Sequence, residues 1–322
     1  MQAARLDGIR VVLVGREKAI RAELSRLGAR DGQVDVVHAE EVVGMHESAV
    51  SSLRRKKQSS IRIAANLVEA GEAQAFVSAG NTGAVMANLK ITLGLLEGVS
   101  RPALAAVLPN LTGQSVWLDV GANVDTRPSH LVQFAIMGWL YSRRILGVAN
   151  PRVGILSIGE EEGKGTDTTR EVIRRLRAAE DDMNLIGNVE GRDIFSGKAD
   201  VIVCDGFMGN VSLKAIEAVT ETVGVFLRQE IERSWRARLG AMLMQGAFSR
   251  FKRRVSYEQY GGVPLLGMNA AAIICHGRSS PLAIRTAIGV ARDHVVNRVN
   301  ERISTELASV AAAIAPPKEV QK

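Results

Sequence analysis

Four stretches of this chain repeat one pattern, in which a short apolar run leads into a glycine-containing polar turn and then into helical periodicity. The apolar runs begin at Ala75, Val116, Val153 and Val201. A buried parallel strand that feeds a helix through such a turn leaves free backbone N–H groups at the positive end of the helix dipole, which suits an anion such as phosphate. In an open parallel sheet these turns share the carboxyl edge. We therefore expect the four turns to meet in one phosphate-binding site.

Strand and helix patterns alternate over almost the whole chain, which predicts an α/β fold with a mostly parallel sheet sandwiched by helices. We expect one catalytic domain over residues 1–314, as a single body or as two lobes around one cleft, and a frayed tail over residues 315–322. Residues 260–267 are expected to form a loop, and residues 282–313 one terminal helix. Strands are expected near residues 9–14, 34–37, 75–78, 104–108, 117–120, 153–158, 184–187, 201–204 and 271–275.

A long helical excursion interrupts this alternation over residues 211–257. Ile216, Val219, Val223 and Phe226 recur at helical spacing, which predicts a helix from residue 211 to about residue 239. Seven basic residues and no acidic one lie between positions 233 and 254. We expect the excursion to protrude from the α/β domain.

The second half of the excursion has the form of a basic amphipathic helix. Met244, Phe248, Phe251 and Val255 fall on one helical face, and basic residues surround them. This pattern is typical of a helix that lies on a membrane surface, for which Phe248, Phe251 and Val255 are the candidate contacts. A hairpin that forms a dimer contact would show the same pattern. Both interpretations stay open.

Composition excludes several other classes of protein. The chain has 322 residues, of which 46% are hydrophobic, and a net charge of +7, which favours acidic partners or anionic surfaces. It lacks the interleaved aromatic residues of a protein that binds single-stranded nucleic acid, and no apolar run is long enough to span a membrane. Its two cysteines, Cys204 and Cys275, are expected to be buried and reduced, with no bound metal.

The turns supply the candidate phosphate ligands. In the first turn Gly80 and Gly83 permit positive φ and close approach, and Asn81 and Thr82 add hydrogen-bonding side chains. A basic run at residues 54–57 precedes the expected helix start at Ser59, and it is either a solvated basic face or a phosphate contact. The three acidic turn residues either orient lysines or hold protons, or they cap helices; they are Asp125, Asp167 and Asp205.

Familiar catalytic signatures are absent. The chain has no G-x-S-x-G elbow, no H-x4-D acyltransferase pattern and no G-x-G-x-x-G dinucleotide motif. Residues 159–165 resemble a P-loop, but the spacing is short and glycine replaces the hydroxyl residue that would hold magnesium. We therefore expect no cofactor and no covalent enzyme nucleophile, and inorganic phosphate can itself be the nucleophile.

At these motifs the chain resembles the bacterial phosphate acyltransferase family (PlsX, acyl-acyl-carrier-protein:phosphate acyltransferase). The resemblance implies a fold similar to isocitrate dehydrogenase and phosphotransacetylase, a homodimer, and a cytoplasmic protein held at the inner face of the cell membrane in phospholipid synthesis. It implies formation of acyl phosphate from inorganic phosphate and acyl carrier protein thioester, with a downstream glycerol-phosphate acyltransferase as a further partner. The matching segments are residues 54–57, 78–84, 119–125, 157–162, 187–193, 204–210 and 260–267.

For this reaction we predict direct phosphorolysis, in which a phosphate oxygen attacks the thioester carbonyl. Lys164, Asn210 or backbone N–H groups would stabilise the oxyanion. The predicted catalytic residues are Lys164, Asn210, Asp205 and His276. The predicted phosphate and substrate residues are Arg54, Lys57, Ser78, Gly80, Asn81, Thr82, Gly83, Asn123, Asp125, Glu162, Gly165 and Asp167.

The chain departs from the family pattern at two places. Family members begin one strand and one helix earlier, with an Asp-Ala-Met-Gly-Gly-Asp turn, so we expect the first family strand to be missing or the start codon to be assigned too late. The pattern also changes on both sides of His276, at residues 268–270 and 278–281. Two alternative functions stay open: a short-chain phosphate acetyl- or butyryltransferase that uses acyl-CoA, and a non-catalytic membrane scaffold of lipid synthesis.

Overall fold

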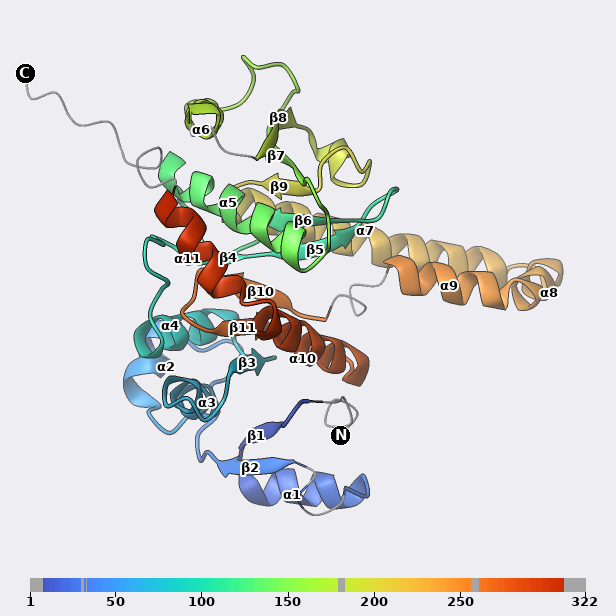
Figure 1. Ribbon diagram of the computed structural model, residues 1–322. Coiled ribbons are helices and arrows are strands. Elements are labelled where there is room, and N and C mark those ends of the chain that lie inside the picture. Colours follow the sequence, from blue (N-terminus) through green and yellow to red (C-terminus); the bar gives the residue numbers. More distant parts are fainter. Residues whose placement is uncertain (1–7, 30–31, 33, 179–182, 256–260, 310–322) are drawn as a thin grey trace, which may run out of the picture.

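The structure is a computed structural model, and it describes residues 8–29, 32, 34–178, 183–255 and 261–309 (Figure 1). The predicted frayed tail, residues 315–322, lies outside the described residues. The chain begins with a small unit in which β1 (Val12–Gly15) pairs in parallel with β2 (Asp35–His38), with α1 (Glu17–Arg26) between them in sequence.

A four-stranded sheet follows, in the order β3 (Ala75–Ser78), β11 (Ala271–Ile274), β10 (Val263–Leu266), β4 (Ala103–Leu104). β3 and β11 are parallel, whereas β10 is antiparallel to both of its neighbours. The prediction of a loop over residues 260–267 is therefore wrong for this strand. The sequence did not predict this strand because Pro264 lacks the N–H group that a residue of a central strand normally donates. The carbonyl of Pro264 still accepts a hydrogen bond from the N–H of Ala105 at 2.9 Å.

A five-stranded sheet has the order β5 (Ala106–Pro109), β6 (Gln114–Leu118), β9 (Val201–Val203), β7 (Arg152–Leu156), β8 (Asn184–Val189). The last four of these strands are mutually parallel, and only β5 is antiparallel to its neighbour. The prediction of a mostly parallel α/β fold is confirmed.

The two larger sheets meet along one continuous stretch of chain, because β4 and β5 are separated by the single residue Ala105. Leu104 pairs with Leu265 of β10 on one side, and its carbonyl accepts from Val120 just beyond β6 on the other. Three antiparallel steps therefore lie between β3 and β6: β11 to β10, β10 to β4, and β5 to β6. An odd number of reversals means that β3 and β6 run in opposite directions.

Helices cover both faces of the joined sheets. On one face the buried side chains of α5 (Pro128–Arg144) pack with those of α6 (Asp167–Ala178) and α11 (Val299–Ser309) against alternate residues of the five-stranded sheet. Phe134 is fully buried in this layer. The opposite face buries Trp117 and Ile202 with side chains of α3 (Ser60–Glu69) and α4 (Thr82–Thr92). In Figure 1, α5 and α11 lie side by side in front of the strands.

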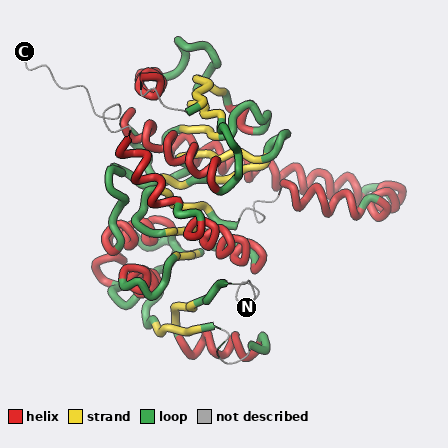
Figure 2. Tube along the Cα trace, in the orientation of Figure 1, coloured by secondary structure: helices red, strands yellow, loops and turns green. Residues whose placement is uncertain are grey.

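The helical excursion forms a projecting arm of three helices, which Figure 2 shows as helix almost throughout. They are α7 (Gly206–Glu232), α8 (Trp235–Leu243) and α9 (Gln245–Val255). The protrusion is confirmed, but the predicted single helix over residues 211–239 is wrong at both ends. α7 starts earlier because Asp205 caps it, and it stops before Ser234, whose extended backbone starts α8.

Two other α-helices and a short 3-10 helix, η2 (Gly191–Ile194), complete the described fold. α2 (Ala49–Arg55) carries the first part of the basic run at residues 54–57 and packs beside α4. The predicted terminal helix over residues 282–313 is two helices, α10 (Pro281–Val296) and α11. The break lies at Arg298, whose φ of +50° is incompatible with a continuous right-handed helix.

Candidate active site

The turn after β6 is built around one buried carboxylate. Asp119 has no exposed surface, and its two oxygens accept from the backbone N–H groups of Leu104, Gly121, Ala122 and Asn123, at 2.7 to 3.1 Å. The side-chain amide of Asn123 donates a further hydrogen bond to the same carboxylate at 2.9 Å. Burial raises the pKa of Asp119, and the donated hydrogen bonds oppose that rise. The carboxylate thus fixes the path of the whole turn.

The turn after β9 packs directly onto this turn. The N–H of Gly206 donates to the carbonyl of Asn123 at 2.8 Å. A Cβ at Gly209 would lie 1.9 Å from the carbonyl oxygen of Asp119, so only glycine permits this approach. A Cβ at Gly121 would lie 3.4 Å from the side-chain oxygen of Asn210. The predicted meeting of the Asn123 and Asn210 turns is confirmed.

The layer beneath these turns is buried. Trp117 is fully buried, and its indole N–H points at the sulfur of Cys204 at 3.1 Å. Burial raises the pKa of the Cys204 thiol, so it is a protonated core group and not a nucleophile. Cys275 is also free and buried, so the prediction of two buried reduced cysteines is confirmed.

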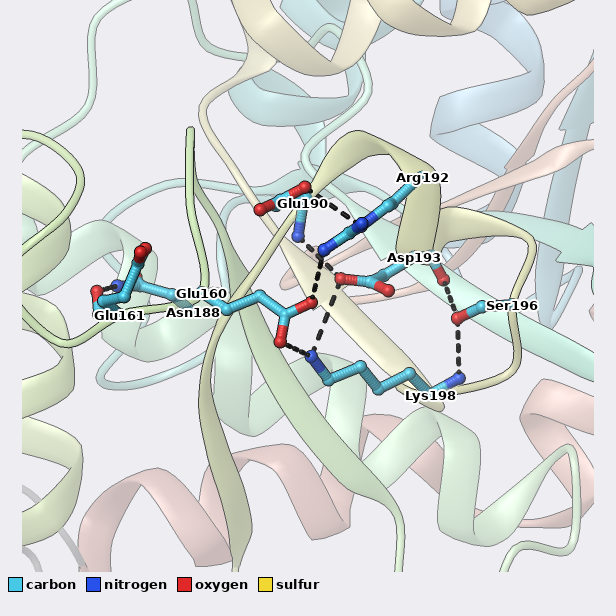
Figure 3. Close-up of polar contacts among 8 residues, drawn as sticks. All are labelled: Glu160, Glu161, Asn188, Glu190, Arg192, Asp193, Ser196 and Lys198. Atoms are coloured by element: carbon cyan, nitrogen blue, oxygen red, sulfur yellow. Dashed lines mark hydrogen bonds and ion pairs between the residues drawn. The ribbon is translucent and has the colours of Figure 1, made fainter.

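Lys164 lies in the loop that follows β7. Side chains of β8 and of the segment after it contact this loop, as Figure 3 shows for Glu160 and Glu161. The side-chain amide of Asn188 donates to the carbonyl of Glu161 at 2.8 Å and more weakly to that of Lys164. Glu160 accepts from Arg192 at 3.1 Å and pairs with Lys198 at 2.6 Å. The ammonium of Lys164 itself is exposed and has no ion pair among the described residues.

The other polar residues near this edge have local partners. Asp205 accepts from the N–H of Met208 at 2.8 Å and caps α7, so the helix-cap interpretation describes its contact. Glu162 pairs with Arg177 at 2.6 Å, and Asp167 pairs with Arg170. Asp125 is exposed. Gly165 has a φ of +92° and passes close to Thr169, so it shapes the loop.

The turn after β3 is built differently. Asn81 accepts from the N–H of Ala84 and caps α4, and its amide nitrogen donates to the carbonyls of three residues of the segment before α2, at 3.0 to 3.2 Å. Ser78 accepts from the N–H of Gly80 at 3.2 Å. Neither Gly80 nor Gly83 has a positive φ, and Thr82 is exposed. The hydrogen-bonding groups of Asn81 are therefore occupied by the fold.

The expectation that all four turns share one edge is wrong for the turn after β3. β3 belongs to the four-stranded sheet and runs opposite to β6, β7 and β9 of the five-stranded sheet, so its carboxyl end does not share their edge. His276 follows β11, which is parallel to β3, so it lies on the same edge as Asn81. The physical reason is the antiparallel insertion of β10 and β4.

Most of the remaining predicted residues are exposed. Arg54 and Lys57 are exposed and unpaired in the part of the chain that the structure describes, whereas Lys56 pairs with Glu47 at 2.6 Å. The imidazole Nδ1 of His276 accepts from the N–H of Arg278 at 3.2 Å. On α9 the Phe251 side chain is 59% exposed and Phe248 is half-buried. The side chain of Val255 lies outside the described residues.

Sequence reasoning missed the residues that position the site. Asp119 was visible only as part of a motif directly after an apolar run, and Asn188 and Glu160 carried no signal of their own.

No described helix combines the length and the apolar character that crossing a membrane requires.

Comparison with known proteins gives the family. Residues 1–302 match the family model described as "Fatty acid synthesis protein". The chain is 50% identical over 305 residues to the phosphate acyltransferases of Citrifermentans bemidjiense and Geobacter sulfurreducens, covering 95% of this chain and 86% and 88% of those proteins.

Solved structures agree on the fold. A phosphotransacetylase from Streptococcus pyogenes superposes with a TM-score of 0.60 at 16% identity, over 90% of this chain and 95% of that one. The EutD phosphotransacetylase from Staphylococcus aureus gives a TM-score of 0.56 at 16% identity, over 91% and 88%. The fold is thus phosphotransacetylase-like, and the chain belongs to the fatty acid synthesis protein family, with the phosphate acyltransferases among its relatives.

Proposed function

We propose that this chain transfers an acyl group from acyl carrier protein to inorganic phosphate and so makes acyl phosphate for phospholipid synthesis. The name of its relatives, phosphate acyltransferase, supports the acceptor and the group transferred. The observation that carries the proposal is the packing of the Asn123 turn against the Asn210 turn at the edge where β7 also ends. Glycines bring the two turns together, and the exposed side-chain amide of Asn210 makes no hydrogen bond with the other described residues.

The proposed reaction is a direct phosphorolysis. A phosphate oxygen forms a bond to the thioester carbonyl carbon, the carbon–sulfur bond breaks, and the sulfur leaves with the electron pair and takes up a proton. Asn210 and Lys164 are the proposed donors to the carbonyl oxygen as it becomes negative; one such donor is commonly worth about 3 kcal/mol. Holding phosphate beside the thioester removes much of the entropic barrier.

The acyl donor is proposed to be carrier protein because the chain has a net charge of +7 and several exposed cations that have no ion pair among the described residues, such as Arg54 and Lys57. Acyl carrier protein is acidic, and complementary charge speeds encounter and fixes orientation. Acyl-CoA is the alternative donor. Purified protein with phosphate should turn over long-chain acyl carrier protein faster than short-chain acyl-CoA, with acyl phosphate trapped by hydroxylamine. Preferred turnover of acetyl- or butyryl-CoA would instead favour the short-chain transferase.

We also propose peripheral membrane binding and a homodimer through the arm. Large apolar side chains are exposed along α7 and α8, including Phe226, Trp235 and Leu243, the last of them 83% exposed. α9 adds exposed Phe251 and Arg250. An arm that leaves such side chains in water is expected to bury them against lipid or a second copy.

Liposome flotation tests the membrane part of the proposal. Phe248→Glu combined with Phe251→Glu should release the protein from anionic vesicles, since two charges would enter the apolar face of α9. Unchanged flotation would refute membrane binding through α9. Retained flotation of the wild type without any acyl phosphate formation would favour the scaffold alternative.

A further inference from the structure

The turn that carries Lys164 is held by one buried amide of the neighbouring strand. The backbone N–H of Lys164 donates to the carbonyl of Glu161 at 2.9 Å and closes the turn. Asn188 of β8 is 4% exposed, and its side chain donates to the same carbonyl at 2.8 Å and to the carbonyl of Lys164 at 3.4 Å. Figure 3 shows this amide beside Glu161. Both ends of the turn are therefore bound to one strand of the sheet.

The helix after the loop holds the same turn from a second direction. The guanidinium of Arg170 in α6 donates to the carbonyl of Gly165 at 2.8 Å and to that of Gly163 at 3.3 Å. The same guanidinium pairs with Asp167. Exposed loops usually move more than the elements that they connect, whereas the backbone of this loop is bound to both β8 and α6.

The side chain of Lys164 also has a defined path. A Cβ at Gly159 would lie 2.9 Å from Cγ and 3.4 Å from Cδ of Lys164, so the aliphatic part of the lysine passes across the face of this glycine. The ammonium group is exposed and has no ion pair among the described residues. The acidic neighbours Glu160 and Glu162 pair instead with arginines. The loop thus presents one unpaired cation from a held backbone.

We infer that Asn188 and Arg170 are positioning residues, which hold Lys164 where its ammonium meets the thioester carbonyl oxygen as negative charge develops there. The inference rests on the proposed function, in which Lys164 is a donor to that oxygen. Both residues act through the carbonyls of the loop. A donor that is already in place needs no reorganisation at the moment of reaction, and a displacement of about 1 Å can cost about a hundredfold in rate.

Turnover of the full-length protein, with acyl carrier protein and phosphate as substrates, tests this role. The test variants are Asn188→Ala and Arg170→Ala, and the controls are Asn184→Ala on the same strand and Arg174→Ala one turn further along the same helix. Each test variant should lower kcat about tenfold, while both KM values change by less than about twofold, because only the placement of a transition-state donor is lost. Arg170 is exposed, so Arg170→Ala gives the test on a residue outside the core.

A double variant separates positioning from a general loss of structure. Lys164→Ala removes the ammonium, so adding Asn188→Ala to it should lower kcat further by less than about twofold, since no donor remains to be misplaced. A tenfold loss that is the same with and without Lys164 would overturn the inference. A kcat in both test variants equal to that of the controls would overturn it as well.

Hydrogen exchange tests the held loop without any substrate. The backbone amides of residues 161–165 should exchange about tenfold faster in the two test variants than in the controls, because the loop opens more often. Equal exchange rates would contradict the inference. If exchange quickens as expected but the wild type forms no acyl phosphate with any donor, the loop is held as described and the proposed function is what fails.

Discussion

The carboxylate of Asp119 accepts two hydrogen bonds from Asn123, one from its backbone N–H at 2.7 Å and one from its side-chain amide at 2.9 Å. The same amide reaches the carbonyl of Pro102, and the carbonyl of Asn123 accepts from Gly206. One residue pair therefore joins the segment before β4, the turn after β6 and the start of α7. The geometry of the candidate active site depends on this pair.

Replacing the buried carboxylate tests that dependence. Asp119→Asn keeps the shape but turns one acceptor oxygen into a donor that faces backbone N–H groups. We expect the free energy of unfolding to fall by about 3 kcal/mol, since hydrogen bonds to a charged group are lost and donors are left unpaired. Urea denaturation measures this change. A fall below about 0.5 kcal/mol, the usual range for surface substitutions, would show that the carboxylate does not organise the turn.

The close approach at Gly209 gives a second prediction. Gly209→Ala places a methyl group against the carbonyl of Asp119, and we expect a loss of about 1–3 kcal/mol from overpacking. Gly224→Ala is the matched control, because it lies in the same helix and a Cβ there meets nothing within 4 Å. The control should gain about 0.5–1 kcal/mol from helix propensity. Equal melting temperatures for the two variants would contradict the packing described here.

Asn81 gives a third prediction, which separates a structural role from a ligand role. Asn81→Ala removes the cap of α4 and leaves three carbonyls without their donor, so the unfolding free energy should fall by about 1–2 kcal/mol. The KM for phosphate should change by less than about twofold, as for a residue outside the binding site. A large rise in that KM with unchanged stability would return the phosphate site to the turn after β3.

The pattern of apolar runs predicted most of the fold. β3, β7 and β9 are short, mostly apolar runs that lead into polar turns, and such runs indicate buried strands. The sequence did not predict β10 because Pro264 and the flanking glycines are typical of loops. The sequence did not predict the helix break at Arg298 because no residue near it requires a positive φ there.

The site was harder to predict because edges depend on pairing between distant strands. The turn at Gly80 and the turn at Asn123 have the same local chemistry, but they follow strands of opposite direction. The antiparallel pairing of β4 with β10, in which Leu104 lies opposite Leu265, is one of the reversals between them. The residue pattern within β4 or β10 does not predict whether the two strands pair parallel or antiparallel.

Cys275 gives a prediction of pH dependence. Burial raises the pKa of its thiol from 9.0 to about 11, so the folded state favours the neutral form. Its contribution to stability is fully present below pH 9 and is lost as the pH rises from 9 through about 11, because the unfolded thiol ionises first. Stability measured at pH 8, 9 and 10 should fall more steeply in the wild type than in Cys275→Ala. Parallel curves would contradict the burial of this thiol.

The turnover of Asn210→Ala tests most directly whether the edge formed by the Asn123 and Asn210 turns carries the chemistry. Asn66→Ala is the control, an exposed asparagine on α3. With saturating phosphate and acyl carrier protein, Asn210→Ala should lower kcat by about a hundredfold, the usual cost of one oxyanion donor, while its melting temperature matches that of the control. A kcat equal to that of the control would show that acyl transfer takes place elsewhere in the molecule.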